Sequence, residues 1–319
     1  MKREQFNNTG SKETRSGFGA GLSILGEKNE NVVALCADLT GSLKMDAFAK
    51  AHPDRFFQAG IAEANMIGVG AGLSLSGKVP FVGSFAAFAT GRVYDQIRQS
   101  IAYSNTNVKI AASHAGITLG EDGATHQILE DLGLMRMLPN MVVINPCDYN
   151  QTKAATIAVG EYVGPVYLRF GRPSVPNFTP EDQKFEIGKA LTLLEGTDVT
   201  IFATGHLVWE AIQAAEALEK EGIMAEVINI HTIKPIDVDA VIESVAKTKA
   251  VVVAEEHFIA GGLCEVIAGT LAANKPAPIE YVAINDTFGQ SGTPFQLMKA
   301  YGLDAENIVK ASKKAIARK

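Results

Sequence analysis

Histidines and carboxylates gather between residues 114 and 126, a segment that reads HAGITLGEDGATH. It follows an apolar run at 108–112 that predicts a strand, so we expect it at the carboxyl end of a sheet, where α/β proteins place binding loops. Either His114 or His126 could carry a proton near neutral pH. The two are twelve positions apart, which is not a recognised spacing for metal ligands, so no metal site is expected. The alternative is that the glycines and carboxylates only form turns.

A second candidate is Glu63, in FFQAGIAEANMIGVGAG, at the start of a helical pattern. Its carboxylate could serve a site at the sheet edge, or it could simply stabilise a helix N-terminus. Three aromatic residues at positions i, i+4 and i+7 favour packing in a helical core, although such rings could also stack on a planar cofactor: Phe81, Phe85 and Phe88. Later in the chain, His206 and residues 255–257 suit a second site, but we expect them to be solvated turn residues.

The elements that must position these residues alternate between short apolar strands and amphipathic helices, which predicts parallel sheets covered on both faces. In the first half we expect strands at 32–36, 79–82, 108–112, 142–144 and 166–168, and helices at 15–27, 63–75 and 91–104. In the second half we expect strands at 199–203, 225–230, 250–254 and 279–284, and helices at 209–222, 237–246 and 261–273. A proline-rich stretch, GRPSVPNFTPEDQK, separates the halves. The predicted fold is α/β, with two doubly wound, mostly parallel domains at 1–172 and 189–319 and a linker at 173–188.

Composition narrows the classes of function. The chain has 319 residues, 47% of them hydrophobic and 20% charged, which is typical of a globular protein with a large core. Its net charge of −6 argues against nucleic acid or an anionic membrane as the main partner. The cysteines Cys36, Cys147 and Cys264 are widely spaced, which indicates neither disulfides nor zinc and favours a reducing cytoplasm. No apolar run approaches the length of a membrane span.

Four segments, in order, carry a resemblance to a known family: ALCADLTGS, FFQAGIAEANM, SFAAFATG and GEDGATHQ. From about Glu13 to the C-terminus the chain resembles the pyrimidine-binding and C-terminal domains of transketolases. The resemblance implies that Glu63 hydrogen-bonds the aminopyrimidine ring of thiamine diphosphate, and that Phe85 and Phe88 pack on that ring. Asp38 resembles a residue near the same cofactor. An earlier aromatic of the family's cluster is Val82 here, so the contacts around the ring would differ in detail.

The resemblance also implies a substrate site. His126 resembles a histidine that contacts substrate hydroxyls and assists proton transfer, which would make it catalytic together with Glu63. Asp122 resembles an acidic residue that bonds a sugar hydroxyl. Four residues match the family's sugar-phosphate contacts: Arg15, Ser42, His114 and Arg169. Arginine offers paired donors and a permanent charge for phosphate, and Arg172 is an alternative to Arg169 in that role.

The family's G-D-G…N motif, which holds Mg²⁺ and the cofactor's diphosphate, does not occur in the sequence. We therefore expect a separate N-terminal subunit to supply the Mg²⁺ ligands, with the cofactor between chains in a dimer of heterodimers. The leading hypothesis is the C-terminal subunit of a split transketolase, which transfers a two-carbon ketol unit between sugar phosphates, as in the pentose phosphate pathway. The rivals are the β component of a 2-oxo acid dehydrogenase, a deoxyxylulose-phosphate-synthase-like enzyme, and a non-enzymatic regulatory or assembly subunit.

Overall fold

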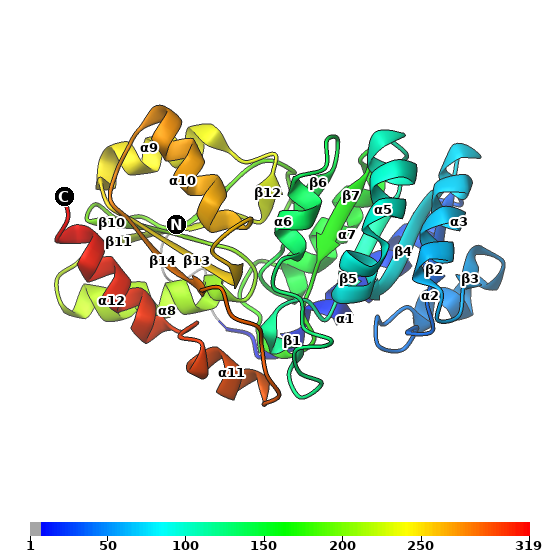
Figure 1. The fold of residues 1–319 in the computed structure, drawn as a ribbon, viewed down its shortest axis with the longest axis horizontal. Helices are drawn as coiled ribbons and strands as arrows, with labels where there is room; N and C mark the ends of the chain where they lie inside the picture. The colour runs from blue at the N-terminus through cyan, green and yellow to red at the C-terminus, as the bar shows by residue number, and fades with distance from the viewer. Residues whose placement is uncertain (1–7) are drawn as a thin grey trace.

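The structure is a computed structural model that describes residues 8–319, so the part of the first predicted domain at residues 1–7 lies outside it. Figure 1 shows two α/β bodies side by side, formed by the first and second halves of the chain. Each body is built around a sheet with mostly parallel strands, which confirms the predicted fold class. In the described part of the chain, no helix is long and apolar enough to cross a membrane.

The sheet of the first half has the strand order β12-β6-β7-β5-β4-β2-β3. All neighbours are parallel except β12, which runs antiparallel to β6. The strands are β2 (Val32–Cys36), β3 (Phe56–Gln58), β4 (Val79–Phe85), β5 (Lys109–Ser113), β6 (Val142–Ile144), β7 (Val166–Arg169) and β12 (Thr232–Lys234). Every residue of β2, β5, β6 and β7 is buried, as expected for strands covered on both faces.

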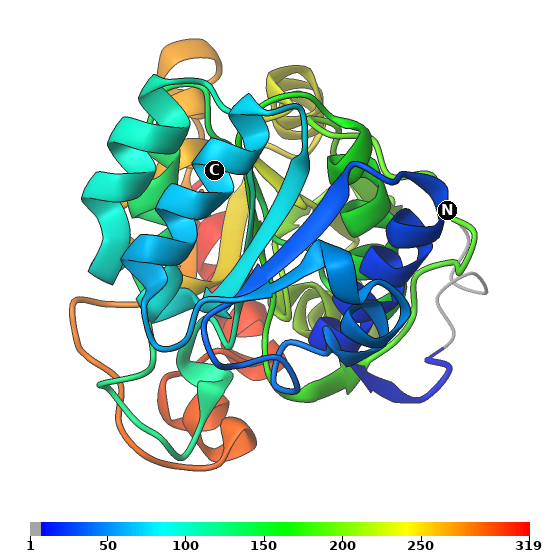
Figure 2. The same ribbon diagram turned by 90° about the vertical axis from the view of Figure 1, so that its right-hand side faces the viewer.

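Helices cover both faces of this sheet (Figure 2). The helices and short turns are α1 (Thr14–Lys28), α2 (Asp46–Ala51), η2 (Pro53–Arg55), α3 (Glu63–Leu75), α4 (Ala86–Ala89), η3 (Gly91–Val93), α5 (Tyr94–Gln96), the π-helix η4 (Ile97–Tyr103), η5 (Ile117–Leu119), α6 (Asp131–Arg136) and α7 (Tyr149–Glu161). The predicted single helix at 91–104 is therefore wrong in form, because the chain winds there through three short pieces. On one face α1 and α7 pack on the strands, and on the other α3, η4 and α6 do so.

The sheet of the second half has the order β14-β13-β10-β11-β9, with β9 antiparallel to β11 and the others parallel. Its strands are β9 (Leu191–Leu194), β10 (Val199–Ala203), β11 (Ala225–Asn229), β13 (Val251–Phe258) and β14 (Ile279–Ile284). Its helices are α8 (Leu207–Lys220), α9 (Val238–Thr248), α10 (Leu263–Asn274), α11 (Pro294–Ala300) and α12 (Ala305–Ile316). Side-chain caps fix several starts: Asp237 for α9, Thr293 for α11 and Asp304 for α12.

The two halves are packed together extensively. Strand β12 belongs to the second half in sequence but extends the first sheet, and one hydrophobic cluster runs through both halves. The segment 173–188, which we predict to be the linker, is anchored: β8 (Ser174–Pro176) pairs with β1 (Ser11–Glu13). The Asp148 carboxylate, which also caps α7, accepts hydrogen bonds from the backbone N–H groups of Phe178 and Thr179. These contacts hold the segment against the first half of the chain.

Candidate functional site

Parallel strands bring the predicted site residues to one edge of the first sheet. Strands β2, β4 and β5 are neighbours, with Cys36 opposite Gly83 and Phe85 opposite Ser113. Asp38 therefore follows the end of β2 and His114 follows the end of β5, close to the end of β4. Helix α3 begins at Glu63, shortly after the end of β3. This edge is where open α/β sheets bind ligands.

The Glu63 carboxylate is buried, with a relative exposure of 4%. Nη1 of Arg92 lies 3.2 Å from both of its oxygens, and the Ser84 hydroxyl lies 3.5 Å from Oε1. The Arg92 guanidinium also lies 4.0 Å above the ring of Phe88. Because the side chain of Arg92 is about half exposed, at 49%, it can move without disturbing the core. The planar guanidinium of Arg92 is thus in contact with the buried Glu63 carboxylate and with the face of the Phe88 ring at the same time.

The aromatic residues connect Glu63 to the two histidines. The ring of Phe85 is stacked on His114 with centroids 3.9 Å apart, and on Phe88 at 5.9 Å. Phe88 in turn contacts His126 edge-on at 5.4 Å. The structure therefore joins five of the predicted site residues in one group, which we call the aromatic cluster: Glu63, Phe85, Phe88, His114 and His126.

The spacing of the three phenylalanines does not reflect helical packing. Phe81 lies inside β4 and is fully buried in the core, Phe85 ends the same strand, and Phe88 belongs to the short helix α4. The expectation of a helical core stripe was wrong, because the i, i+4, i+7 pattern runs across the end of a strand. The strand end turns Phe85 and Phe88 toward the loop at the sheet edge, where they meet the histidines.

His114 is held as a neutral ring. Its φ is 58°, in the left-handed region, and Nδ1 lies 2.7 Å from the hydroxyl of Ser113. Burial and the neighbouring Arg15 and Arg172 lower the pKa of His114 to about 3. The ring can therefore give or accept hydrogen bonds at neutral pH without adding a charge.

Arg15 lies in a second group beside His114. It donates to Glu13 and, through Nη1 at 3.1 Å, to the backbone oxygen of Ser42. Although burial by itself would raise it, hydrogen bonds from Arg15, Lys44 and Ser16 lower the pKa of Glu13 to about 2. The Nε of Arg15 is buried and has no hydrogen-bond partner in the described chain. A donor of this kind is costly to leave unpaired, so it suits a ligand oxygen.

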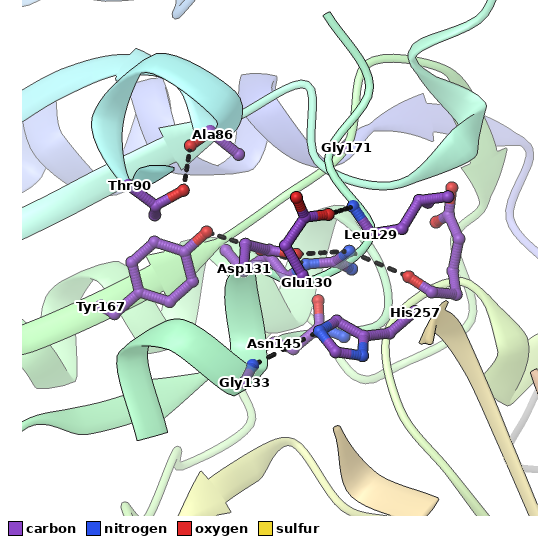
Figure 3. A network of polar contacts seen from close by, with 12 residues as sticks. Ala86, Thr90, Leu129, Glu130, Asp131, Gly133, Asn145, Tyr167, Gly171 and His257 are labelled. Carbon is purple, nitrogen blue, oxygen red and sulfur yellow. Dashed lines mark hydrogen bonds and ion pairs between the residues drawn. The ribbon is translucent and has the colours of Figure 1, made fainter. Parts of the chain in front are cut away.

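Arg169, one of the two arginines that the sequence offers for phosphate, has its guanidinium in a buried ion pair. Its side chain is 3% exposed, and Nε lies 2.7 Å from Oδ2 of Asp131. Nη2 donates to Oδ1 of Asp131 at 3.3 Å and to the backbone oxygen of Glu256 at 2.9 Å. Asp131 also accepts the hydroxyl of Tyr167 at 2.6 Å (Figure 3). Although burial opposes it, the Arg169 charge holds the pKa of Asp131 below its usual value, so this buried pair stays ionised.

Arg172, the other arginine that the sequence offers, has a more exposed side chain than Arg169. Its guanidinium is 38% exposed, and Nη1 donates to the backbone oxygen of Leu119 and to Glu121, each at 2.7 Å. Glu121 is an exposed partner that a stronger anion could replace. Arg172 is close enough to His114 to lower its pKa, so the two belong to one neighbourhood.

Two more predicted residues, Asp38 and Asp122, also lie outside the aromatic cluster. Asp38 is exposed at a φ of 57°, and its N–H donates to the side chain of Gln58. Asp122 is exposed in the loop after Gly120. The carboxylate of neither residue makes a hydrogen bond to the described part of the chain, so both are free to meet a ligand or another chain.

Sequence reasoning missed the residues that the second half brings to this site. His206, Glu256 and His257 were expected to be solvated, yet Glu256 and His257 are buried and the side chain of His206 is only 8% exposed. Nε2 of His257 accepts the N–H of Gly133 at 3.3 Å, and its Nδ1 lies 2.7 Å from the backbone oxygen of Phe258. The signal in the sequence was a run of polar residues at the end of an apolar strand, and in the fold this run points into the contact between the halves.

Comparisons with known proteins now identify the family. The model of the family "Transketolase, pyrimidine binding domain" matches residues 11–177, and that of "Transketolase, C-terminal domain" matches residues 188–308. The chain is 49% identical over 303 residues to a putative transketolase C-terminal section from Methanocaldococcus jannaschii, covering 94% of this chain and 95% of that protein. The chain belongs to the transketolase family.

Two further comparisons define which part of a transketolase it resembles. It is 45% identical over 293 residues to a 6-deoxy-6-sulfo-D-fructose transketolase subunit of a Clostridium species, covering 92% of this chain and 91% of that protein. A solved structure described as a split gene transketolase in an inactive β4 tetramer matches with a TM-score of 0.91 at 48% identity, covering 96% of this chain and 99% of that chain. The chain is thus a split-transketolase-type subunit in a family of thiamine-diphosphate-dependent transferases.

Proposed function

We propose that this chain is the pyrimidine-binding half of a two-chain transketolase, which transfers a two-carbon ketol unit from a ketose phosphate to an aldose phosphate. The observation that carries the proposal is the buried Glu63 carboxylate beside the rings of Phe85 and Phe88, which Arg92 links to it. The planar Arg92 guanidinium donates to Glu63 while lying on Phe88. A flat aminopyrimidine ring with N–H donors has the same two requirements, so the residues present fit thiamine diphosphate.

In this proposal Glu63 accepts a hydrogen bond from the pyrimidine, Phe85 and Phe88 hold the ring in place, and Asp38 lies at the rim of the pocket. When bound, thiamine diphosphate supplies the carbanion that attacks the ketose carbonyl. Glu63 would supply the buried carboxylate that shares a proton with the ring, which is the acid–base role this chain offers the cofactor. His126 would give and take protons at substrate hydroxyls, since it lies partly exposed against Phe88.

The phosphate end of the substrate would meet the cations beside His114. Arg172 supplies an exposed guanidinium and Arg15 a buried free donor, while Ser42 and neutral His114 add hydrogen bonds. Asp122 would bond a sugar hydroxyl. Relatives act by name on different anionic sugars, one on a sulfofructose and another on apulose 4-phosphate, so the proposal covers anionic ketoses as a class.

A separate N-terminal subunit would supply the Mg²⁺ ligands and hold the diphosphate, in a cytoplasmic dimer of heterodimers. Two names support this division: a relative of matching length is called a C-terminal section, and the tetramer of a similar split-gene chain is described as inactive. The domain boundaries at 172 and 189 and the linker between them belong to the same proposal.

The test is reconstitution. The chain is purified alone and with a transketolase N-terminal subunit carrying the G-D-G…N motif, and each sample receives thiamine diphosphate, Mg²⁺, a ketose phosphate and an aldose phosphate. Ketol transfer in the mixture supports the proposal. Turnover of a 2-oxo acid instead would favour the dehydrogenase-type β component. Full activity with Glu63→Ala would favour a regulatory or assembly subunit.

A further inference from the structure

A carboxylate from the second half of the chain reaches into the loop that carries the two histidines. Glu256 lies on β13 and is buried, with 3% exposure. Its Oε1 accepts the backbone N–H of Thr118 at 2.6 Å, across a sequence separation of 138 residues. A Cβ at Gly116 would lie 2.3 Å from the carboxylate, and the φ of Gly116 is 82°. The loop backbone is therefore shaped to admit this carboxylate.

The turn that Glu256 holds also holds Arg172. Thr118 is the middle residue of η5, and the backbone oxygen of the next residue, Leu119, accepts Nη1 of Arg172 at 2.7 Å. One three-residue turn thus connects a carboxylate of the second half to the exposed guanidinium beside His114. A displacement of Thr118 would be passed directly to the oxygen that orients Arg172.

A second contact from the same half fixes the other end of the loop. Nε2 of Gln127 donates to the backbone oxygen of Gln290 at 3.0 Å, and also to those of Ile117 and Gly120 in the loop. A Cβ at Gly123 would lie 2.6 Å from the hydroxyl of Ser291. The loop is therefore held at both ends by segments that lie beyond residue 250.

Burying Glu256 is expensive for stability alone. Oε2 lies 3.5 Å from Nδ1 of His206, and burial lowers the pKa of that histidine while Glu256 opposes the shift. Glu256 also interacts with the buried Arg169, whose pKa it raises. A buried ionic group of this kind is commonly no more stable than an apolar residue of similar size. Stability alone therefore does not account for a carboxylate at this position, whereas its hydrogen bond to Thr118 would fix the position of the loop.

We propose that Glu256 is a positioning residue: through the Ile117–Leu119 turn it sets Arg172 for the phosphate end of the substrate. The second half of the chain would then be needed for substrate recognition although it lies outside the pyrimidine pocket. The inference rests on the proposed function, because it names the anchor of a contact that ketol transfer between sugar phosphates would use.

The experiment uses the reconstituted two-chain enzyme and compares three variants. Glu256→Asp keeps the charge but withdraws its oxygens by about 1.5 Å, and Glu256→Leu removes the acceptor. Each should raise KM for a ketose phosphate, Glu256→Leu by about tenfold, with little change in KM for the same ketose without phosphate. Glu256→Gln keeps an acceptor for Thr118 and should restore a KM within about twofold of wild type.

Glu255→Leu is the matched control. Glu255 is also buried on β13, but its carboxylate accepts the N–H groups of Leu263 and Cys264 at the start of α10, inside the second half. The Glu255→Leu variant should leave unchanged the ratio of KM for the ketose phosphate to KM for the unphosphorylated ketose. In an Arg172→Ala background, Glu256→Leu should raise KM for the ketose phosphate no further.

A readout in the chain alone separates this inference from the proposed function. The Thr118 amide should exchange with solvent faster in Glu256→Leu than in wild type or in Glu255→Leu. If the wild-type mixture shows no ketol transfer, the proposed function fails. If it is active, and Glu256→Leu and Glu256→Asp leave the KM for ketose phosphate unchanged or affect both ketoses equally, the positioning role is overturned.

Discussion

Replacing Arg169 by leucine should lower the free energy of unfolding without selectively weakening phosphate binding. Arg169 contributes one side of a buried ion pair, with 3% exposure for the arginine side chain and none for Asp131. Its removal leaves the Asp131 carboxylate with the hydroxyl of Tyr167 and without a cation. Breaking such a pair costs about 3–5 kcal/mol in the free energy of unfolding. For a chain of 319 residues the corresponding drop in melting temperature is roughly 4–8 °C.

The matched control for Arg169→Leu is Arg172→Leu. Arg172 pairs with the exposed Glu121 and should contribute little to stability, so its loss should leave the urea midpoint nearly unchanged. In the reconstituted enzyme it should raise KM for a ketose phosphate while sparing the unphosphorylated sugar. The reasoning is refuted if the two variants exchange roles, with Arg169→Leu as stable as wild type and selectively impaired toward phosphate.

Three further results are expected. Glu63→Gln should lower kcat of the reconstituted enzyme by about 10²–10⁴-fold, as for a lost acid–base group, and a loss of less than threefold would remove Glu63 from its role. Burial lowers the pKa of Lys109 from 10.5 to about 7, so the unfolded chain binds more protons between those values and stability should rise with pH across that window. Urea unfolding at pH 7 and pH 9 should show a smaller rise for Lys109→Met than for wild type; an equal rise contradicts this. His114 has a folded pKa of about 3 against 6.5 unfolded, so its contribution to stability is lost as pH falls from 6.5 toward 3, and the loss between pH 7 and pH 5 should be smaller in His114→Gln.

Much of the fold could be predicted because its elements carry strong local signals. The runs at 32–36 and 142–144 are short, apolar and rich in β-branched residues, and they form β2 and β6 with those bounds. Helix α3 likewise begins and ends where its pattern indicated. Helix α12 was not predicted, although Asp304 caps its start. The prediction of a single helix at 91–104 was wrong in form because a helical sequence pattern does not reveal a change to π-helical winding.

The site could be predicted in part, and the limit was contact between residues far apart in sequence. Motifs indicated Glu63, Phe85, Phe88 and the histidines, and the structure brings these together. Motifs could not decide between two arginines three positions apart, because the choice depends on Asp131, which lies on another element. For the same reason, sequence motifs could not predict the hydrogen bond between Thr118 and Glu256, because these two residues are 138 positions apart.

The central claim is that this chain supplies only the pyrimidine half of a cofactor site shared with another subunit. The direct measurement is ketol transfer from a ketose phosphate as the N-terminal subunit is titrated into a fixed amount of this chain, with thiamine diphosphate and Mg²⁺ present. The account predicts no turnover for either chain alone, activity that saturates at one subunit per chain, and no activity when the chain carries Glu63→Ala. Turnover by this chain alone, or undiminished activity of the Glu63→Ala mixture, would contradict it.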